Sequence, residues 1–203
     1  MPAIKRISSV RLSRKKQQGV AAVEFSLVAI IFFMLFFGIV EVARAMYIMN
    51  TLQEVTRRAA AFASNADFSK DADMQKVRQR AIFRDSPGFL LFAEPVSDRN
   101  VVIDYMWIRK DGTTMTMVPI PSGALPASPA ANFANCLSNP YSQSCIRLVR
   151  VRICKTAGAD ACEPVGYKNL LSLIPFSFGL PRAKTIVTAE TLGMPAGVPA
   201  CEC

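Results

Sequence analysis

The residues best placed for chemistry stand at the start of a long apolar run. Glu24 is the only charged residue between Val20 and Val40, and Gly19 comes directly before that run. A cut after Gly19 would give Val20 a free α-amine, which is mostly protonated at neutral pH. Glu24 lies four residues on, and therefore on the same face of a helix as that amine. The spacing predicts an ion pair between a new N-terminus and this carboxylate, within one chain or between neighbouring chains.

A carboxylate in an apolar helix needs a partner, because an unpaired charge is expensive to bury. A subunit packed at the wrong height would leave both the amine and Glu24 unmatched. We therefore expect Glu24, with Phe25 beside it, to fix the register of an assembly, as a buried polar residue does in a coiled coil. The alternative is that Glu24 lies near the membrane surface and its side chain extends to water.

Catalytic groups are hard to find elsewhere in the chain. The sequence has no histidine, which excludes Ser-His and Cys-His nucleophile arrangements. The segment around Ser177 lacks the first glycine of a nucleophile elbow, and no glycine-rich phosphate loop occurs. The cysteine spacings do not fit a zinc site. We expect no catalytic residues, no cofactor and no metal.

The apolar run is long enough to cross a membrane. From Val20 to Val40 it would extend about 31 Å as a helix, which matches the hydrocarbon core of a bilayer. Residues 1–18 carry six basic residues and no acidic one. The positive-inside rule then places residues 1–19 in the cytoplasm as a leader, and everything after Val40 on the exported side. A nucleic-acid-binding arm explains this basic tail less simply, so we expect no nucleic-acid partner.

All six cysteines lie in the last third of the chain. They are Cys136, Cys145, Cys154, Cys162, Cys201 and Cys203. An even number in the part expected to be exported suits an oxidising compartment, although six cysteines allow fifteen pairings. Cys136 and Cys145 could pin a long loop. Cys201 and Cys203 are too close to pair easily with each other, so we expect each to find a distant partner or one to stay free.

Hydrophobic periodicity predicts a long N-terminal helix over residues 20–65, because no proline interrupts it and its second half is amphipathic. A second helix is expected over 69–84. Strands are expected over residues 101–109, 113–118, 146–153 and 183–192, with a hairpin turn at 110–112. Residues 119–145 and 170–178 are expected to form loops. The fold class is therefore α+β, with a membrane-spanning helix (20–65) that continues into a small antiparallel domain (66–203).

Two sets of charged residues have a simple expected location. Glu41 and Arg44 are expected at the membrane interface, where they bound the span, and a specific subunit contact is the alternative. Arg147, Arg150 and Arg152 are expected on a solvated strand face, with an acidic partner surface as the alternative.

The segment from Gly19 to Phe25, after its basic leader, resembles a type IV prepilin processing site. The continuation over residues 37–53 is similar to TadE-like minor pseudopilins of the tight adherence (Flp) pilus system. The resemblance extends over residues 14–65 and, more loosely, over the strand that ends at Cys154. The chain departs from the family's usual Gly-Ala-Arg turn at Arg57-Arg58-Ala59, which leaves a TadF-like assignment open.

This resemblance implies a pseudopilin-like fold and cleavage after Gly19 by a prepilin peptidase. It also implies a single-pass protein of the bacterial inner membrane with a periplasmic domain. Its partners would be other pilins or pseudopilins and the pilus assembly platform. Two alternatives remain at this stage: a signal peptide cut after Ala45, which would release a soluble protein starting at Met46, and an uncleaved signal anchor carrying a periplasmic binding domain.

Overall fold

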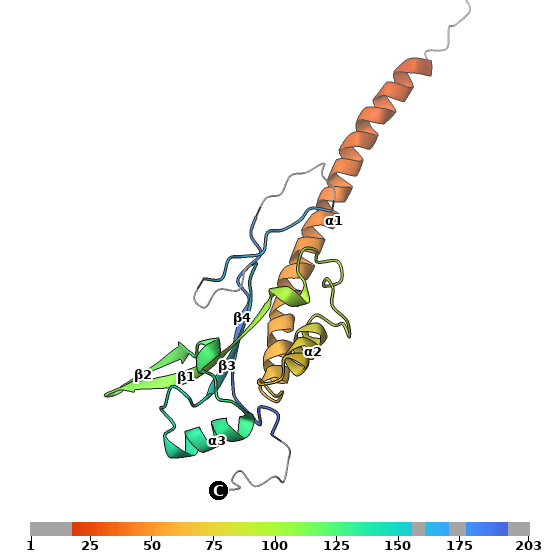
Figure 1. Ribbon diagram of the computed structural model, residues 1–203. Helices are drawn as coiled ribbons and strands as arrows, with labels where there is room; N and C mark the ends of the chain where they lie inside the picture. The colour runs from red at the N-terminus through yellow and green to blue at the C-terminus, as the bar shows by residue number, and fades with distance from the viewer. Residues whose placement is uncertain (1–17, 156–160, 171–177, 195–203) are drawn as a thin grey trace, which may run out of the picture. The chain divides into compact units, whose positions relative to one another are not determined.

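The computed structural model describes residues 18–155, 161–170 and 178–194 (Figure 1). The chain divides into two compact units, residues 1–40 and residues 41–203. In the first unit the described residues form the N-terminal part of helix α1. The second unit contains the remainder of α1, two shorter helices and a four-stranded sheet.

Helix α1 (Gln18–Ala63) confirms the long helix predicted from the sequence. It contains no proline, and it ends where the amide of Ser64 still bonds to Ala60 O while that of Asn65 turns to Phe62 O. In the second unit, fully buried apolar positions recur every three or four residues along one line of this helix. They are Ile48, Leu52, Val55, Ala59 and Ala63, and Thr56 and Ala60 beside this line are also buried. This spacing places one continuous stripe of the helix against the core.

Helix α2 (Asp71–Ala81) lies within the helix predicted over residues 69–84 but is shorter. Aspartates occupy its first turn and arginines its last, which complements the helix dipole. The C-terminal end is set by Phe83, whose φ is +62°, and by a bond from Arg84 N to Gln79 O. A left-handed residue followed by this long-range amide bond is the usual helix stop, although glycine is the common choice there.

The sheet has the order β2-β1-β3-β4, and every neighbouring pair is antiparallel. Its strands are β1 (Val101–Asp111), β2 (Thr114–Pro119), β3 (Leu148–Ile153) and β4 (Lys184–Thr188). Strands β1 and β2 are joined through Gly112 and Thr113, with Asp111 paired to Thr114. Gly112 has φ +62°, as the first position of a type II′ hairpin requires. The α+β prediction is confirmed.

One predicted loop is partly helical. Residues 119–145 contain a short 3₁₀ turn, Ser122–Ala124, and helix α3 (Pro129–Ser138). Ser128 caps α3 by accepting a hydrogen bond from Ala131 N at 3.2 Å, and Pro129 fits the first helical turn. The helix was not predicted, because the prolines of this segment indicate a loop and the N-cap pair Ser128-Pro129 was overlooked. The loop predicted over residues 170–178 lies mostly outside the described residues.

The core of the second unit is formed between helices α1 and α2 and one face of the sheet (Figure 1). Val101 and Tyr105 of β1 face the same side as Val149, Val151 and Ile153 of β3, and all five are buried. The Tyr105 hydroxyl lies 3.4 Å from Met74 Sδ of α2, and Thr56 of α1 hydrogen-bonds Thr185 of β4 at 2.9 Å. Each fully buried aliphatic side chain contributes about 1.5–3 kcal/mol.

Candidate functional site

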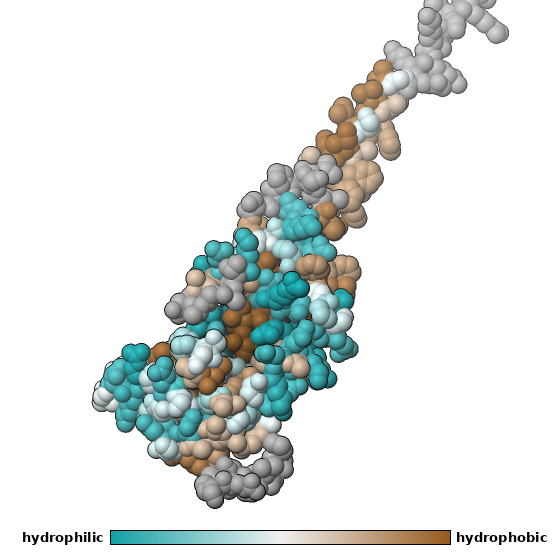
Figure 2. All heavy atoms as spheres, viewed as in Figure 1, coloured by the Kyte–Doolittle hydropathy of each residue, from teal (hydrophilic) through white to brown (hydrophobic). Residues whose placement is uncertain are grey.

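The described part of the first unit is an apolar helix with an exposed surface. Phe25, Val28, Leu35 and Ile39 are each exposed by more than 60% in the isolated chain. An 18-residue window of α1 reaches a mean hydropathy of 2.6, and no part of that window is buried. Figure 2 shows this apolar surface along the N-terminal part of α1. The helix fits a single-pass membrane anchor in length and composition.

The predicted processing residues stand in the first turns of this helix. Gly19 is exposed, and apart from its chain neighbours and its own helix backbone no atom of the described residues lies within 4 Å of the place where a Cβ would be; Val20 is 55% exposed. Glu24 is exposed and lies one turn further along. Because Cα–Cβ bonds in a helix tilt toward the N-terminus, the Glu24 side chain leans toward the turn that begins at Val20. The geometry therefore permits the predicted pairing.

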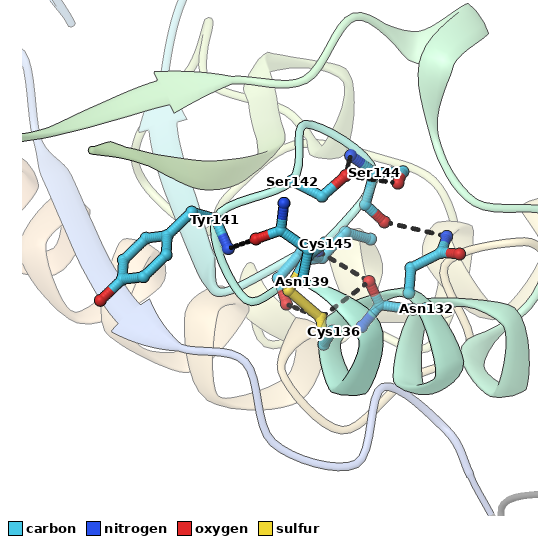
Figure 3. The surroundings of a disulfide bond; sticks show 9 residues. Asn132, Cys136, Asn139, Tyr141, Ser142, Ser144 and Cys145 are labelled. Atoms are coloured by element: carbon cyan, nitrogen blue, oxygen red, sulfur yellow. Dashed lines mark hydrogen bonds between the residues drawn. A yellow bond between two sulfur atoms is a disulfide. The ribbon is translucent and has the colours of Figure 1, made fainter. Parts of the chain in front are cut away.

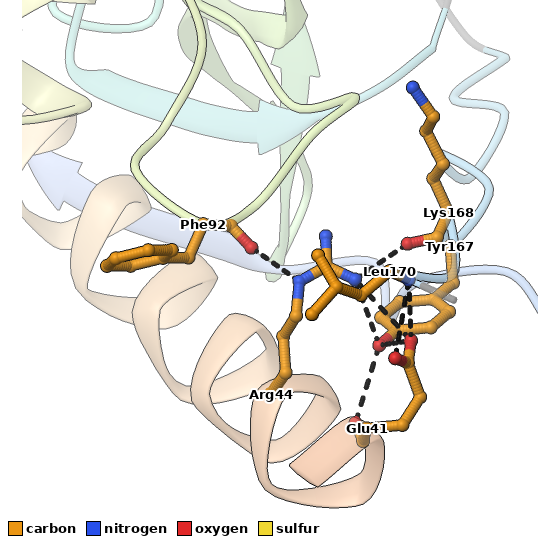
Figure 4. Close-up of polar contacts among 6 residues, drawn as sticks. All are labelled: Glu41, Arg44, Phe92, Tyr167, Lys168 and Leu170. Atoms are coloured by element: carbon orange, nitrogen blue, oxygen red, sulfur yellow. Dashed lines mark hydrogen bonds and ion pairs between the residues drawn. The ribbon is translucent and has the colours of Figure 1, made fainter. Parts of the chain in front are cut away.

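A buried polar cluster occupies the start of the second unit (Figure 4). The Glu41 side chain is almost fully buried, and its Oε1 accepts hydrogen bonds from the Tyr167 hydroxyl at 2.5 Å and from Leu170 N at 3.1 Å. Arg44 Nη1 lies 3.5 Å from the same carboxylate oxygen. A buried carboxylate is stable only with such partners.

Arg44 completes this cluster from the next position on the same helix face. Its Nε donates to Phe92 O at 2.8 Å, and its Nη1 donates to Lys168 O at 2.7 Å. The Tyr167 ring stacks on Phe178 with centroids 4.6 Å apart. Arg44 and Glu41 thus connect α1 to two loops that are distant in sequence, and we call these residues, with Tyr167, the Glu41 cluster.

The contacts of the Glu41 cluster were not predicted from the sequence. Glu41 and Arg44 are bound within their own domain, and their expected place at the membrane interface stays a prediction. Burial, and then the hydrogen bond to Glu41, raises the pKa of the Tyr167 hydroxyl, so it remains a donor over the physiological pH range. The i, i+3 spacing of opposite charges was visible in the sequence, but Tyr167 carried no signal that would have linked it to them.

The arginines of β3 are likewise engaged within the chain. Arg150 Nε and Arg152 Nε lie 2.9 Å and 2.8 Å from Asp104 Oδ2 on the neighbouring strand β1. Arg152 is buried and Arg150 is half-buried, whereas Arg147 is exposed. The prediction of a solvated face is therefore wrong for Arg150 and Arg152. Antiparallel pairing sets Asp104 directly opposite Arg150, which the sequence alone could not establish.

Four of the candidate cysteines form two short-range disulfides. Cys136 joins Cys145 with Cα atoms 4.8 Å apart, and Cys154 joins Cys162 with Cα atoms 5.0 Å apart. Cys201 and Cys203 lie outside the described residues. The first bridge links α3 to the segment that leads into β3.

Hydrogen bonds reinforce the first bridge (Figure 3). Asn132 Oδ1 accepts from Ile146 N at 2.7 Å, and Asn135 Nδ2 donates to Ser144 O at 3.2 Å. The helix and the loop are thus joined by both covalent and polar contacts, which constrains a proline-rich segment that has few buried apolar side chains of its own. Across the described residues, no group of three metal-binding side chains is present.

In the comparison with known proteins, one family model matches part of the chain. Residues 19–61 match the family model of TadE-like proteins. No curated protein and no solved structure matches the chain. The match begins at the predicted processing glycine and ends two residues before α1 does, so it concerns this helix and not the sheet.

Proposed function

We propose that this TadE-like protein of the Tad pilus system is a structural minor pseudopilin that a prepilin peptidase cuts after Gly19. The observation that carries the proposal is the family match over residues 19–61, which covers the apolar helix and its Gly19–Glu24 spacing. The protein acts by assembling with other pilins or pseudopilins at the inner-membrane platform. Catalysis has no part in this proposal.

Processing creates the charge that Glu24 requires. A cut after Gly19 leaves Val20 as the first residue, with an ammonium group and the unpaired amides of a helix start. Both features favour a carboxylate within the first turns. The ammonium can pair with Glu24 of its own chain or with Glu24 of a neighbouring subunit. Where the pair joins two subunits, it forms only when the neighbour's carboxylate lies at the same height in the bundle.

The proposed topology follows from charge and length. The basic leader stays in the cytoplasm, the apolar part of α1 spans the inner membrane once, and the sheet domain lies in the periplasm. The two disulfides, Cys136–Cys145 and Cys154–Cys162, support an oxidising location for that domain.

Determination of the mature N-terminus tests the processing step. Mass spectrometry of the protein isolated from cells should give a chain that begins at Val20. Gly19→Ala should leave the leader attached, whereas the control Gly38→Ala, in the same apolar run, should be cut normally. A wild-type chain that begins at Met1 or at Met46 would contradict the proposal and favour a signal anchor or a secreted protein, respectively.

A second experiment tests the register role of Glu24. Glu24→Ala should be cut and inserted like the wild type, but the amount of assembled pili at the cell surface should fall. Glu54→Ala, which removes an exposed carboxylate from the second half of the same helix, is the matched control. Normal piliation in the Glu24→Ala strain would remove the register argument while leaving the processing step intact.

A further inference from the structure

We infer that strand β2 pairs with β2 of a second copy of this chain, antiparallel and about a twofold axis at Thr116. The inference concerns the second unit alone, so it depends neither on the cut after Gly19 nor on the membrane span. Strand β2 is one edge of the sheet, and β4, at the other edge, is joined to α1 through Thr185 (Figure 1). Among the described strands, β2 has only β1 as a neighbour. An open sheet edge offers backbone donors and acceptors that an extended strand can bind.

Strands β1 and β2 form a two-stranded ribbon that extends beyond β3. The pairing of β1 with β3 ends at Met106 and Leu148, whereas the pairing of β1 with β2 continues to Asp111 and Thr114. The first four residues of β2 are exposed. A two-stranded ribbon has little stability of its own, and a third strand is a common way to support one. Pairing through the β2 edge supplies that strand.

The register of the sheet decides which groups of β2 are free. Ile120 N donates to Tyr105 O at 2.8 Å, in the same register that joins β1 to β2. Hydrogen-bonded positions alternate along an antiparallel pair, so every second residue before Ile120, including Thr116, bonds to β1. The N–H and C=O groups of Met115 and Met117 therefore point toward the open edge. These are the groups that a further strand would bind.

The β2 edge lacks the features that usually keep strands apart. Residues 112–146 contain no Asp, Glu, Lys or Arg, although 19% of the residues in the whole chain are charged. Natural edge strands are commonly protected by lysine, by a bulge or by proline, but β2 has no bulge and its one proline, Pro119, is its last residue. It carries instead Met115 and Met117, which are 59% and 55% exposed. Interfaces between proteins are enriched in methionine and have few charges at their centre.

A second copy of the chain fits this edge. With Thr116 on the axis, Met115 of one copy lies opposite Met117 of the other, so each free N–H meets a free C=O. The two Thr116 side chains face each other across a close pair that lacks backbone hydrogen bonds, which is a favourable contact for threonine. Neither strand brings a charge into the contact, so two identical surfaces do not repel each other. The pairing joins the two four-stranded sheets into one continuous sheet.

Cysteine crosslinking tests the position of the axis. In this pairing the two Thr116 Cα atoms lie about 4.5 Å apart, within reach of a disulfide, whereas the two Thr114 Cα atoms lie about 14 Å apart. The full chain in detergent micelles would carry Thr116→Cys or the matched control Thr114→Cys, at another exposed threonine on the same face of β2. With copper phenanthroline as oxidant, Thr116→Cys should give at least about fivefold more covalent dimer on a non-reducing gel than Thr114→Cys. Both variants keep the native cysteines, so the wild-type chain measures their background.

Removal of one backbone donor tests whether the copies pair through the strand edge. Met117→Pro deletes an N–H that points away from β1, a position at which an edge strand tolerates proline. Added to Thr116→Cys, it should lower the yield of dimer by at least about fivefold, whereas Met117→Leu, which keeps the N–H, should not. The fluorescence of Trp107 on β1 checks that the sheet domain of each variant is folded.

The remaining outcomes overturn the inference. A dimer yield from Thr114→Cys that equals or exceeds that from Thr116→Cys would indicate random collision, and no dimer from either would show that copies do not meet at β2. An undiminished yield with Met117→Pro would exclude backbone pairing. If, in cells, Thr116→Cys is recovered joined to a different protein and not to its own copy, the edge serves another partner. None of these results alters the processing step, and we expect the same crosslink in a Gly19→Ala chain.

Discussion

The Glu41 cluster gives the sharpest test of how α1 is joined to its domain. Tyr167→Phe removes one hydroxyl and keeps the ring that stacks on Phe178. The lost bond is 2.5 Å long, joins two buried side chains and has a carboxylate as its acceptor. Bonds of this kind contribute about 1.5–3 kcal/mol, so we expect the free energy of unfolding to fall by about 2 kcal/mol.

A double-mutant cycle isolates this interaction. Glu41→Gln keeps an acceptor but removes the charge that faces Arg44, which lies 3.5 Å away and is 12% exposed. We expect this variant to lose about 2–3 kcal/mol, because the guanidinium is left without its countercharge. The combined Glu41→Gln and Tyr167→Phe variant should lose less than the sum, with a coupling energy of about 1–2 kcal/mol.

Urea unfolding of the full chain in detergent micelles measures these energies. The single tryptophan, Trp107 on β1, is half-buried and reports the unfolding of the sheet domain. Tyr47→Phe, at a partly exposed tyrosine of the same helix, is the control and should change stability by less than about 0.5 kcal/mol. Strictly additive losses, or a Tyr167→Phe variant as stable as this control, would refute the assigned role of the cluster.

Three further outcomes follow from contacts in the same domain. Asp104→Asn should lower the free energy of unfolding by about 2 kcal/mol, because the buried Arg152 loses a carboxylate at 2.8 Å. A urea midpoint equal to that of wild type would contradict this. Gly193→Ala should cost about 1–3 kcal/mol, since φ is +86° and a Cβ would lie 2.5 Å from Asp67 N; unchanged thermal unfolding would exclude the close approach. Burial opposes ionisation of Asp67, but hydrogen bonds from Ser69 and Lys70 outweigh it and lower the pKa of this carboxyl below its ordinary value of 3.8. The carboxylate therefore contributes to stability above pH 3.8, and this contribution is lost as the pH falls through the lower pKa of the folded state. Asp67→Asn should flatten that part of the urea midpoint plotted against pH, and an unaltered curve would count against this.

Local signals identified most of the fold. The 3.6-residue pattern in α1 and the alternation in β3 arise because each element must turn one face toward the core, and turn residues indicated the hairpin of β1 and β2. The errors have local causes too. The prolines of residues 119–145 obscured the cap at Ser128, and a left-handed Phe83 ended α2 earlier than its composition indicated.

The candidate site divides in the same way. The Gly19–Glu24 spacing is a property of one helix, so the sequence could predict it without knowledge of the rest of the chain. The partners of Arg150 and Glu41 lie 46 and 126 residues away, at Asp104 and Tyr167, and nothing in their local sequence indicates the contact.

By itself, the sequence predicted an apolar helix able to serve as a membrane anchor, a processing site after Gly19, and the segments that form helices and strands. These depend on neighbours one turn or one strand apart. The tertiary structure decided which charges neutralise one another, which cysteines are joined, and which loops bind Glu41 and Arg44 of α1. These pairings depend on sheet register and on the packing of distant loops against α1. They matter for stability because a buried charge has no water to solvate it and needs a partner within the fold.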